Sequence, residues 1–147
     1  MDGQDVKLLI VGRQWEADEE VHEIKVTTQG RIYRGPNETI LTYRETENSG
    51  MGQTRTTLKI LAEGGIHLLR TGETQSKMEF VAGSRHMTQV STPVGLLQMG
   101  LYTHEAEAQL GEEKGDIKIR YSLDYANQDS VNISLTVDYE NLDRAHD

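Results

Sequence analysis

Apolar and polar residues alternate along much of the chain. The clearest alternation covers residues 117–124 and 131–138, in which every second residue is apolar and the residues between are polar. Shorter stretches of the same kind occur at 24–28, 39–44 and 58–60. Side chains along a strand point to opposite faces in turn, so a period of two predicts a strand with one buried face. The pattern therefore predicts a protein built mainly of half-buried strands.

Turn signals separate the predicted strands at short intervals. They are segments rich in Gly, Asn, Glu and Ser, at 35–37, 48–50, 63–65, 71–73, 82–84, 112–115 and 127–129. Their spacing predicts about ten strands of roughly five to nine residues, a usual strand length. Regular short strands with tight turns are typical of an antiparallel sandwich or barrel. No gap is long enough for a linker, so we expect one domain over residues 1–147, with its core at about 6–140.

Two segments are rich in helix-forming residues, although their patterns favour other structures. Residues 14–25 lack a continuous apolar stripe, which favours an acidic loop that leads into a strand at about Val21. Residues 104–114 contain Ala106, Ala108 and Leu110 in alternation, which favours a strand. We therefore expect no helix in either segment.

Composition excludes several classes of protein. No apolar run approaches the roughly 18 residues that a membrane-spanning helix needs, and the chain has no Cys for a disulfide framework. The net charge of −9 is opposite to that of a general nucleic-acid binder. We therefore expect no nucleic-acid partner and no membrane partner. The lack of Cys and of a basic leader at the N-terminus favours a cytoplasmic location.

Three segments, in this order and spacing, carry a resemblance to a known family. The first is 42–60, with Thr-Tyr-Arg-Glu-Thr-Glu and Thr-Thr-Leu-Lys-Ile; the second is 68–83, with Leu-Leu-Arg-Thr-Gly and Met-Glu-Phe; the third is 115–124. Together they resemble the YwiB-like family, bacterial proteins classed as a domain of unknown function. The resemblance implies an all-β fold, a single antiparallel calycin-like (lipocalin-like) β-barrel of about 8–10 strands. It implies no activity and supplies no catalytic residues.

Arg70 is the residue of most interest for function. Ile66, Leu68 and Arg70 share one strand face, so Arg70 points inward if the two apolar residues do. A buried guanidinium needs a partner, and Tyr43 and Glu45 are candidates because they continue an apolar face of their own strand. Two interpretations stay open. Arg70 anchors an anionic or carboxylate ligand at the barrel mouth, or it closes one barrel end against the protein's own carboxylate.

Other candidate groups are weaker. Met78, Met87 and Met99 with Phe80 and Leu97 line an adaptable apolar cavity or simply form core. Glu45 and Glu47 share a strand face, but we interpret them as a solvated charge run rather than a catalytic carboxylate pair.

No familiar catalytic or metal-binding motif occurs in the sequence. The five His have neither His-x-His nor His-x-x-x-His spacing. A Gly-x-Ser-x-Gly elbow is absent, and Ser84 and Ser91 have no base nearby in the sequence. We therefore expect no catalytic residue, no metal and no cofactor.

The sequence thus favours a small-molecule binding barrel over an enzyme. The candidate ligand-binding residues are Tyr43, Glu45, Arg70, Met78 and Phe80. The alternative is a protein-interaction or structural module with a filled barrel, which could be a homodimer.

Overall fold

Ten strands make up the described part of the chain, and it contains no helix. The computed structural model describes residues 3–17, 19–45, 53–72, 75–92, 95–125 and 130–142. The strands are β1 (Gly3–Trp15), β2 (His22–Arg34), β3 (Glu38–Arg44), β4 (Thr54–Leu61), β5 (Ile66–Gly72), β6 (Ser76–Phe80), β7 (Arg85–Thr92), β8 (Gly95–Leu110), β9 (Lys114–Asp124) and β10 (Val131–Asn141). In these ranges no helix is long and apolar enough to cross a membrane.

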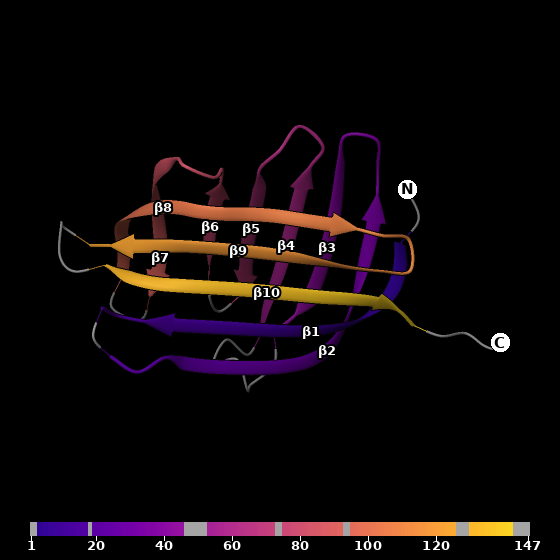
Figure 1. Cartoon of the computed structure of the whole chain (residues 1–147), viewed down its shortest axis with the longest axis horizontal. Helices are drawn as coiled ribbons and strands as arrows, with labels where there is room; N and C mark the ends of the chain where they lie inside the picture. The colour runs from indigo at the N-terminus through magenta and orange to yellow at the C-terminus, as the bar shows by residue number, and fades with distance from the viewer. Residues whose placement is uncertain are drawn as a thin grey trace.

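The strands form one closed antiparallel barrel. Each strand pairs with its neighbours in sequence, and β1 also pairs with β10 (Figure 1). This order is that of an up-and-down barrel, in which closure removes free sheet edges. The predicted all-β antiparallel barrel is confirmed, and the two clearest alternating segments of the sequence fall in β9 and β10.

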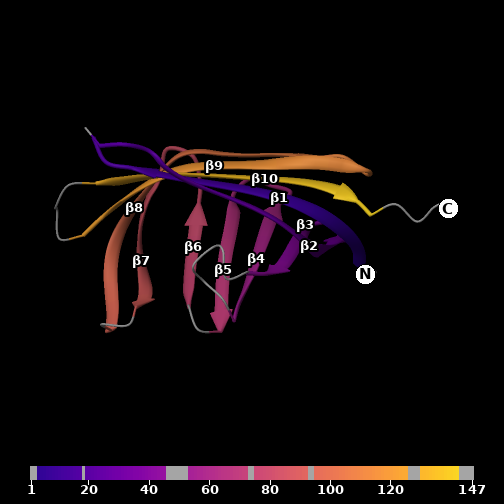
Figure 2. The ribbon, with the colours of Figure 1, turned by 90° about the horizontal axis from the view of Figure 1, so that it is seen from below.

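The barrel is flattened into two layers whose strands cross (Figures 1 and 2). Strands β1, β2, β9, β10 and most of β8 form the first layer, and the shorter strands β3–β7 form the second. β8 belongs to both layers, since its Gly95–Tyr102 half pairs with β7 and its Gly100–Leu110 half pairs with β9. The expected strand length was wrong for these elements: β8 has 16 residues, and β1 and β2 have 13 each. A strand that bends from one layer into the other needs no turn between them, so no turn signal marks the corner.

A bulge within β8 explains why its alternation is broken. The pairing of β8 with β9 shifts register between Thr103 and Glu105. An extra residue reverses which side chains face inward beyond it. Thr103 is therefore buried before the bulge, and Ala106 and Ala108 pack against the core after it. The prediction of a strand in this segment is confirmed, and so is the loop between Trp15 and His22.

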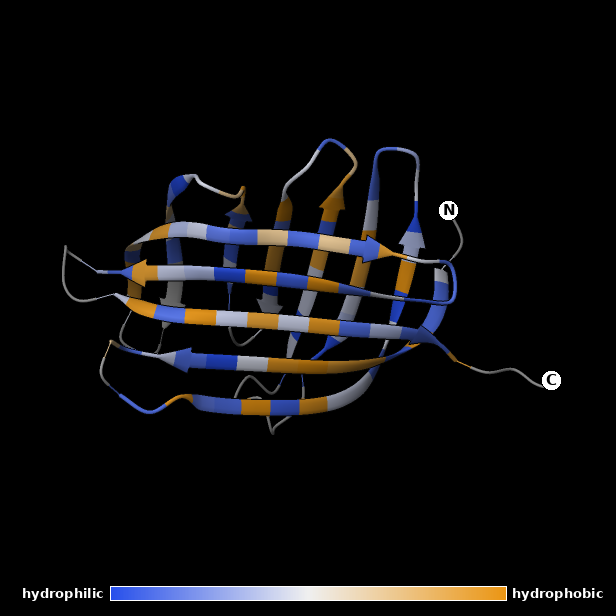
Figure 3. Cartoon of the chain, viewed as in Figure 1, coloured by the Kyte–Doolittle hydropathy of each residue, from blue (hydrophilic) through white to orange (hydrophobic). Residues whose placement is uncertain are grey.

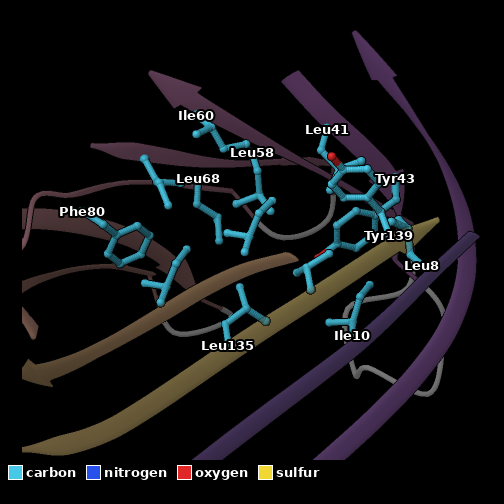
Figure 4. Close-up of a cluster of buried hydrophobic side chains, with 14 of the residues drawn as sticks. Leu8, Ile10, Leu41, Tyr43, Leu58, Ile60, Leu68, Phe80, Leu135 and Tyr139 are labelled. Carbon is cyan, nitrogen blue, oxygen red and sulfur yellow. The ribbon is translucent and has the colours of Figure 1, made fainter. Parts of the chain in front are cut away.

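The inward faces of both layers form one hydrophobic core. Figure 3 shows the alternation as bands along the strands, and Figure 4 shows the side chains that meet between the layers. Leu8, Leu41, Leu58, Leu68 and Phe80 are fully buried. Burial of such side chains contributes roughly 1.5–3 kcal/mol each. The core fills the middle of the barrel and leaves a cavity towards one end.

Candidate functional site

A cavity of about 340 Å³ lies between the two layers, among side chains that face the barrel interior. Most of its wall is apolar, formed by Ile10, Val26, Met78, Tyr121, Ile133 and Leu135. The polar side chains of its buried part are Tyr43, Glu45 and Arg70. At its rim, Arg13, Gln14 and His22 are exposed to solvent. The cavity therefore runs from an open, polar rim to a buried floor.

Strand register brings the polar residues of the cavity together. Tyr43 of β3 pairs with Thr56 of β4, and Thr56 pairs with Arg70 of β5. Side chains at paired positions point to the same face of a sheet. Beyond the end of β3, the Glu45 amide donates to the Thr54 carbonyl at 2.7 Å, so the antiparallel ladder extends by one further pair. Glu45 therefore keeps the inward orientation of Tyr43.

Arg70 and Glu45 form a buried ion pair with poor hydrogen-bond geometry. Arg70 Nε lies 3.9 Å from Glu45 Oε2, and the two side chains are 14% and 5% exposed. Arg70 Nε is buried and makes no hydrogen bond to any described residue. Glu45 Oε2 instead accepts a hydrogen bond of 2.5 Å from Thr56 Oγ1. The carboxylate is thus held by Thr56, while the guanidinium keeps an unused donor.

The predicted inward orientation of Arg70 and its pairing with Glu45 are confirmed. The interpretation of Glu45 as part of a solvated charge run was wrong, because Glu45 is only 8% exposed. The ladder continues past the last residue of β3, so the side chain cannot turn to solvent. Glu47 lies outside the described residues.

Two buried tyrosines border the ion pair. Burial raises the pKa of Tyr43, the Glu45 carboxylate raises it further, and the Arg70 guanidinium opposes the shift. Burial also raises the pKa of Tyr121, again against the effect of Arg70. Both phenols therefore stay neutral at ordinary pH and add no negative charge to the cavity.

The remaining sequence-predicted residues divide between the cavity and its surroundings. Met78 is buried and lines the cavity. Phe80 does not line it: its ring is fully buried and packs 4.8 Å from the ring of Tyr121. Met87, expected inside with Met78, is 60% exposed on the outer face of β7. Alternation alone did not show which residues of β7 face inward. Thr88 is buried, so the inward face of β7 is the one that contains Thr88 and not Met87.

The charges that line the cavity are mainly positive. The charged side chains of its wall are two arginines, Arg13 and Arg70, and one carboxylate, Glu45. Arg13 Nη2 lies 3.6 Å from Glu23 Oε1, and this ion pair is more exposed than the pair of Arg70 with Glu45. The wall thus differs in sign from the whole chain, which carries a net charge of −9.

Sequence reasoning missed a Ser–His contact on the outer face of the first layer. His104 Nε2 lies 2.7 Å from Ser122 Oγ, and Ser122 Oγ donates to Asn132 Oδ1 at 2.9 Å. With its proton directed to Asn132, the hydroxyl accepts from His104, so His104 does not act as its base in this arrangement. These residues come from β8, β9 and β10 and lie outside the cavity. Their long sequence separations explain why no motif pointed to them.

No group of three or more His, Asp or Glu side chains within the described ranges is placed to hold a metal ion. The cavity is therefore lined by the guanidinium groups of Arg13 and Arg70, the carboxylate of Glu45 and the phenols of Tyr43 and Tyr121.

Comparison with known proteins identifies the family. A family model described as "Domain of unknown function (DUF1934)" matches residues 9–137. The chain belongs to this family. The DUF1934 match includes all five candidate ligand-binding residues of the sequence analysis.

Two further similarities agree with the DUF1934 assignment. The chain is 27% identical over 125 residues to the uncharacterized beta-barrel protein YwiB of Bacillus subtilis (strain 168), covering 85% of this chain and 84% of that protein. The crystal structure of the ywiB protein from Bacillus subtilis superimposes with a TM-score of 0.81 at 25% identity, covering 96% of this chain and 94% of that one. The resemblance to the YwiB-like family is therefore confirmed. The description of DUF1934 assigns no function to the family.

Proposed function

We propose that this protein binds a small molecule with an apolar body and a carboxylate or similar oxyanion inside its barrel. The observation that carries this proposal is the buried guanidinium of Arg70, which faces an apolar cavity with a donor that no described residue uses. The catalytic alternative lacks a comparable observation, because the Ser122 hydroxyl and His104 lie on the outer face.

The size and lining of the cavity suit a small ligand. Its volume of about 340 Å³ lies just above the lower limit of roughly 300 Å³ for typical ligand pockets. Such pockets are mostly apolar, with a few polar groups that fix the ligand's orientation. Here the polar groups are gathered around Arg70, so an amphipathic ligand has one favoured orientation.

The charge at Arg70 favours an anion. A guanidinium carries five N–H donors in a planar fork that matches a carboxylate or phosphate. At 3.9 Å, the distance from Arg70 Nε to Glu45 Oε2 exceeds that of a hydrogen bond. An oxyanion in the cavity would therefore gain charge-assisted hydrogen bonds without displacing Glu45 from Thr56. Glu45 weakens the attraction for the anion but does not occupy the donors.

The structural alternatives make different demands on the barrel. A purely structural Arg70 needs no cavity beside it, and a module that acts through its outer surface has a filled interior. The cavity next to Arg70 favours the ligand-binding proposal over both. The cytoplasmic location and the homodimer stay predictions.

The proposal is tested by comparing carboxylates with their neutral amides. Octanoate and benzoate should raise the melting temperature and bind in calorimetry, and octanamide and benzamide should bind much more weakly. Loss of charge-assisted hydrogen bonds costs about 1.5–3 kcal/mol, so Arg70→Gln should weaken carboxylate binding roughly 10- to 100-fold. Glu45→Gln should strengthen it, because it removes the competing negative charge.

Arg13→Gln is the matched control, since it removes the same type of charge from the exposed rim. It should change carboxylate affinity less than Arg70→Gln does. Circular dichroism and urea unfolding establish that each variant is folded. Equal binding of amides and carboxylates, or no binding of either carboxylate at millimolar concentration, would refute the proposal.

A further inference from the structure

The closed ladder of the barrel has its fewest paired positions between β6 and β7. Among the described residues, Ser76 and Val90 are the one pair across this seam, whereas five positions pair between β5 and β6 and eight between β7 and β8. A side chain provides one further link, since Thr88 Oγ1 donates to the Lys77 carbonyl at 2.6 Å. The described backbone ladder therefore does not seal this part of the wall.

A groove of about 580 Å³ follows the seam and reaches both faces of the wall. Its lining includes inward-facing side chains, among them fully buried Leu101, and outward-facing ones, among them Met87, which is 60% exposed. Inward and outward side chains alternate along a strand and lie on opposite faces of a continuous sheet. Residues of both faces therefore meet at this groove.

Unpartnered polar atoms gather along this groove. Five buried side-chain polar atoms lack a hydrogen-bond partner in the described structure, and three of them belong to groove residues: Arg70 Nε, Ser76 Oγ and His86 Nδ1. Buried polar groups are nearly always paired, and leaving one unpaired is costly. The groove therefore presents groups that a bound polar molecule would satisfy.

Arg70 and Ser76 form the inner end of the groove. They are paired positions of β5 and β6, so their side chains lie side by side on the same face. Both offer a donor, an N–H and an O–H. Arg70 also lines the barrel cavity, so this residue is shared by the cavity and the groove.

We propose that the seam is the head-group half of the binding site: the oxyanion of the ligand lies between Arg70 and Ser76, and its apolar body occupies the barrel cavity. This inference rests on the proposed function and adds to it a second binding residue and an orientation. The charged end of the ligand points to the β6–β7 seam, away from the rim at Arg13 and His22.

A pair of matched variants tests the role of Ser76. Ser76→Ala removes the hydroxyl at the proposed subsite. Thr103→Val is the control, because Thr103 Oγ1 is also buried and unpartnered but Thr103 lines neither the cavity nor the groove. Calorimetry with octanoate and benzoate should show a loss of affinity of roughly 5-fold or more in Ser76→Ala, as expected for one hydrogen bond, and no change in Thr103→Val.

The outcomes separate this inference from the proposed function. If the unaltered protein and Ser76→Ala bind the two carboxylates equally well, the inference is wrong and the proposed function stands. Equal weakening in both variants would also refute it, because the effect would then come from general loosening of the barrel. If the unaltered protein binds neither carboxylate, the proposed function fails and the inference fails with it. Urea unfolding of both variants establishes that they fold.

Discussion

The seam where the two ends of the chain meet and the seam in the middle of the chain differ sharply. Between β1 and β10, ten consecutive positions are paired, from Val6 with Asn141 to Trp15 with Asn132. Between β6 and β7 there is one pair. At the closing seam, Leu8 and Tyr139 are paired and both are buried, and Tyr139 donates a hydrogen bond of 2.7 Å to the Gly111 carbonyl.

The difference between the two seams indicates where this barrel can bind a ligand. The closing seam is held by ten paired positions and by buried apolar side chains, and Asn141 Oδ1 is a buried polar atom there with no hydrogen-bond partner among the described residues. Beside the β6–β7 seam, in contrast, Arg70 Nε and Ser76 Oγ are both buried without a hydrogen-bond partner among the described residues. Ligand-binding segments commonly belong to the less stable parts of a fold. We expect mutations at the first seam to affect stability and mutations at the second to affect binding.

The largest expected effect is at the closing seam. Leu8→Ala should lower the free energy of unfolding by about 3 kcal/mol, since burial of Leu8 is complete and truncation leaves a cavity. Leu9→Ala, one residue along the same strand, should cost less than about 1 kcal/mol because Leu9 is 41% exposed. Urea unfolding measures both. Similar losses in the two variants would show that β1 does not bury the face described.

An intermediate effect should appear at alkaline pH. The folded protein raises the pKa of Tyr43, so the unfolded chain releases this proton first, near its ordinary pKa of about 10. Above that pH the folded state holds more protons, and its stability should fall by up to about 1.4 kcal/mol per pH unit for each such tyrosine. Below pH 10 this contribution is fully present.

Two Tyr→Phe variants locate that effect. Tyr43→Phe should flatten the dependence of unfolding free energy on pH between 10 and 11. Tyr139→Phe, at the closing seam, should flatten it less, because Arg34 opposes the rise in the pKa of Tyr139. Urea unfolding at several pH values gives the slopes. An unchanged slope in Tyr43→Phe would contradict the buried position of this phenol beside Glu45.

The smallest expected effect is at the β6–β7 seam. Thr88→Val removes the hydrogen bond to the Lys77 carbonyl and should cost about 1 kcal/mol. Hydrogen exchange should become faster for amides of β6 and β7, and those of β1 and β10 should keep their rates, because a local opening does not require unfolding of the barrel. Equal acceleration at both seams would mean that the barrel opens as one unit.

Most of the fold could be predicted from the sequence, because period-two patterns state the inward face of each strand. They predicted an antiparallel sandwich or barrel, the inward position of Arg70, and Glu45 as one of its two candidate partners, and the resemblance to the YwiB-like family implied the barrel. They could not give the length of β8, because a bulge and a change of layer interrupt alternation without ending a strand.

The site could be predicted only in part. Parity places Tyr43, Arg70 and Met78 inside, but it says nothing about where packing leaves space, so it could not show that Phe80 lies behind the cavity wall. Ser76 went unnoticed because its role depends on the pairing of β6 with β5 and on the lack of pairing with β7. Such long-range register is set by the whole barrel and leaves no trace in a short segment.

The pairing of β1 with β10 also makes the molecule a ring. Each of the ten strands contacts the next in sequence, and the start of β1 lies beside the end of β10, with Val6 opposite Asn141. A circular permutant could therefore join these ends by a short linker and begin at β7 instead. Cutting the chain in the turn at Gly83 would separate β6 from β7, between which the described residues form a single pair. In such a ring, the same strand order results whichever strand begins the chain.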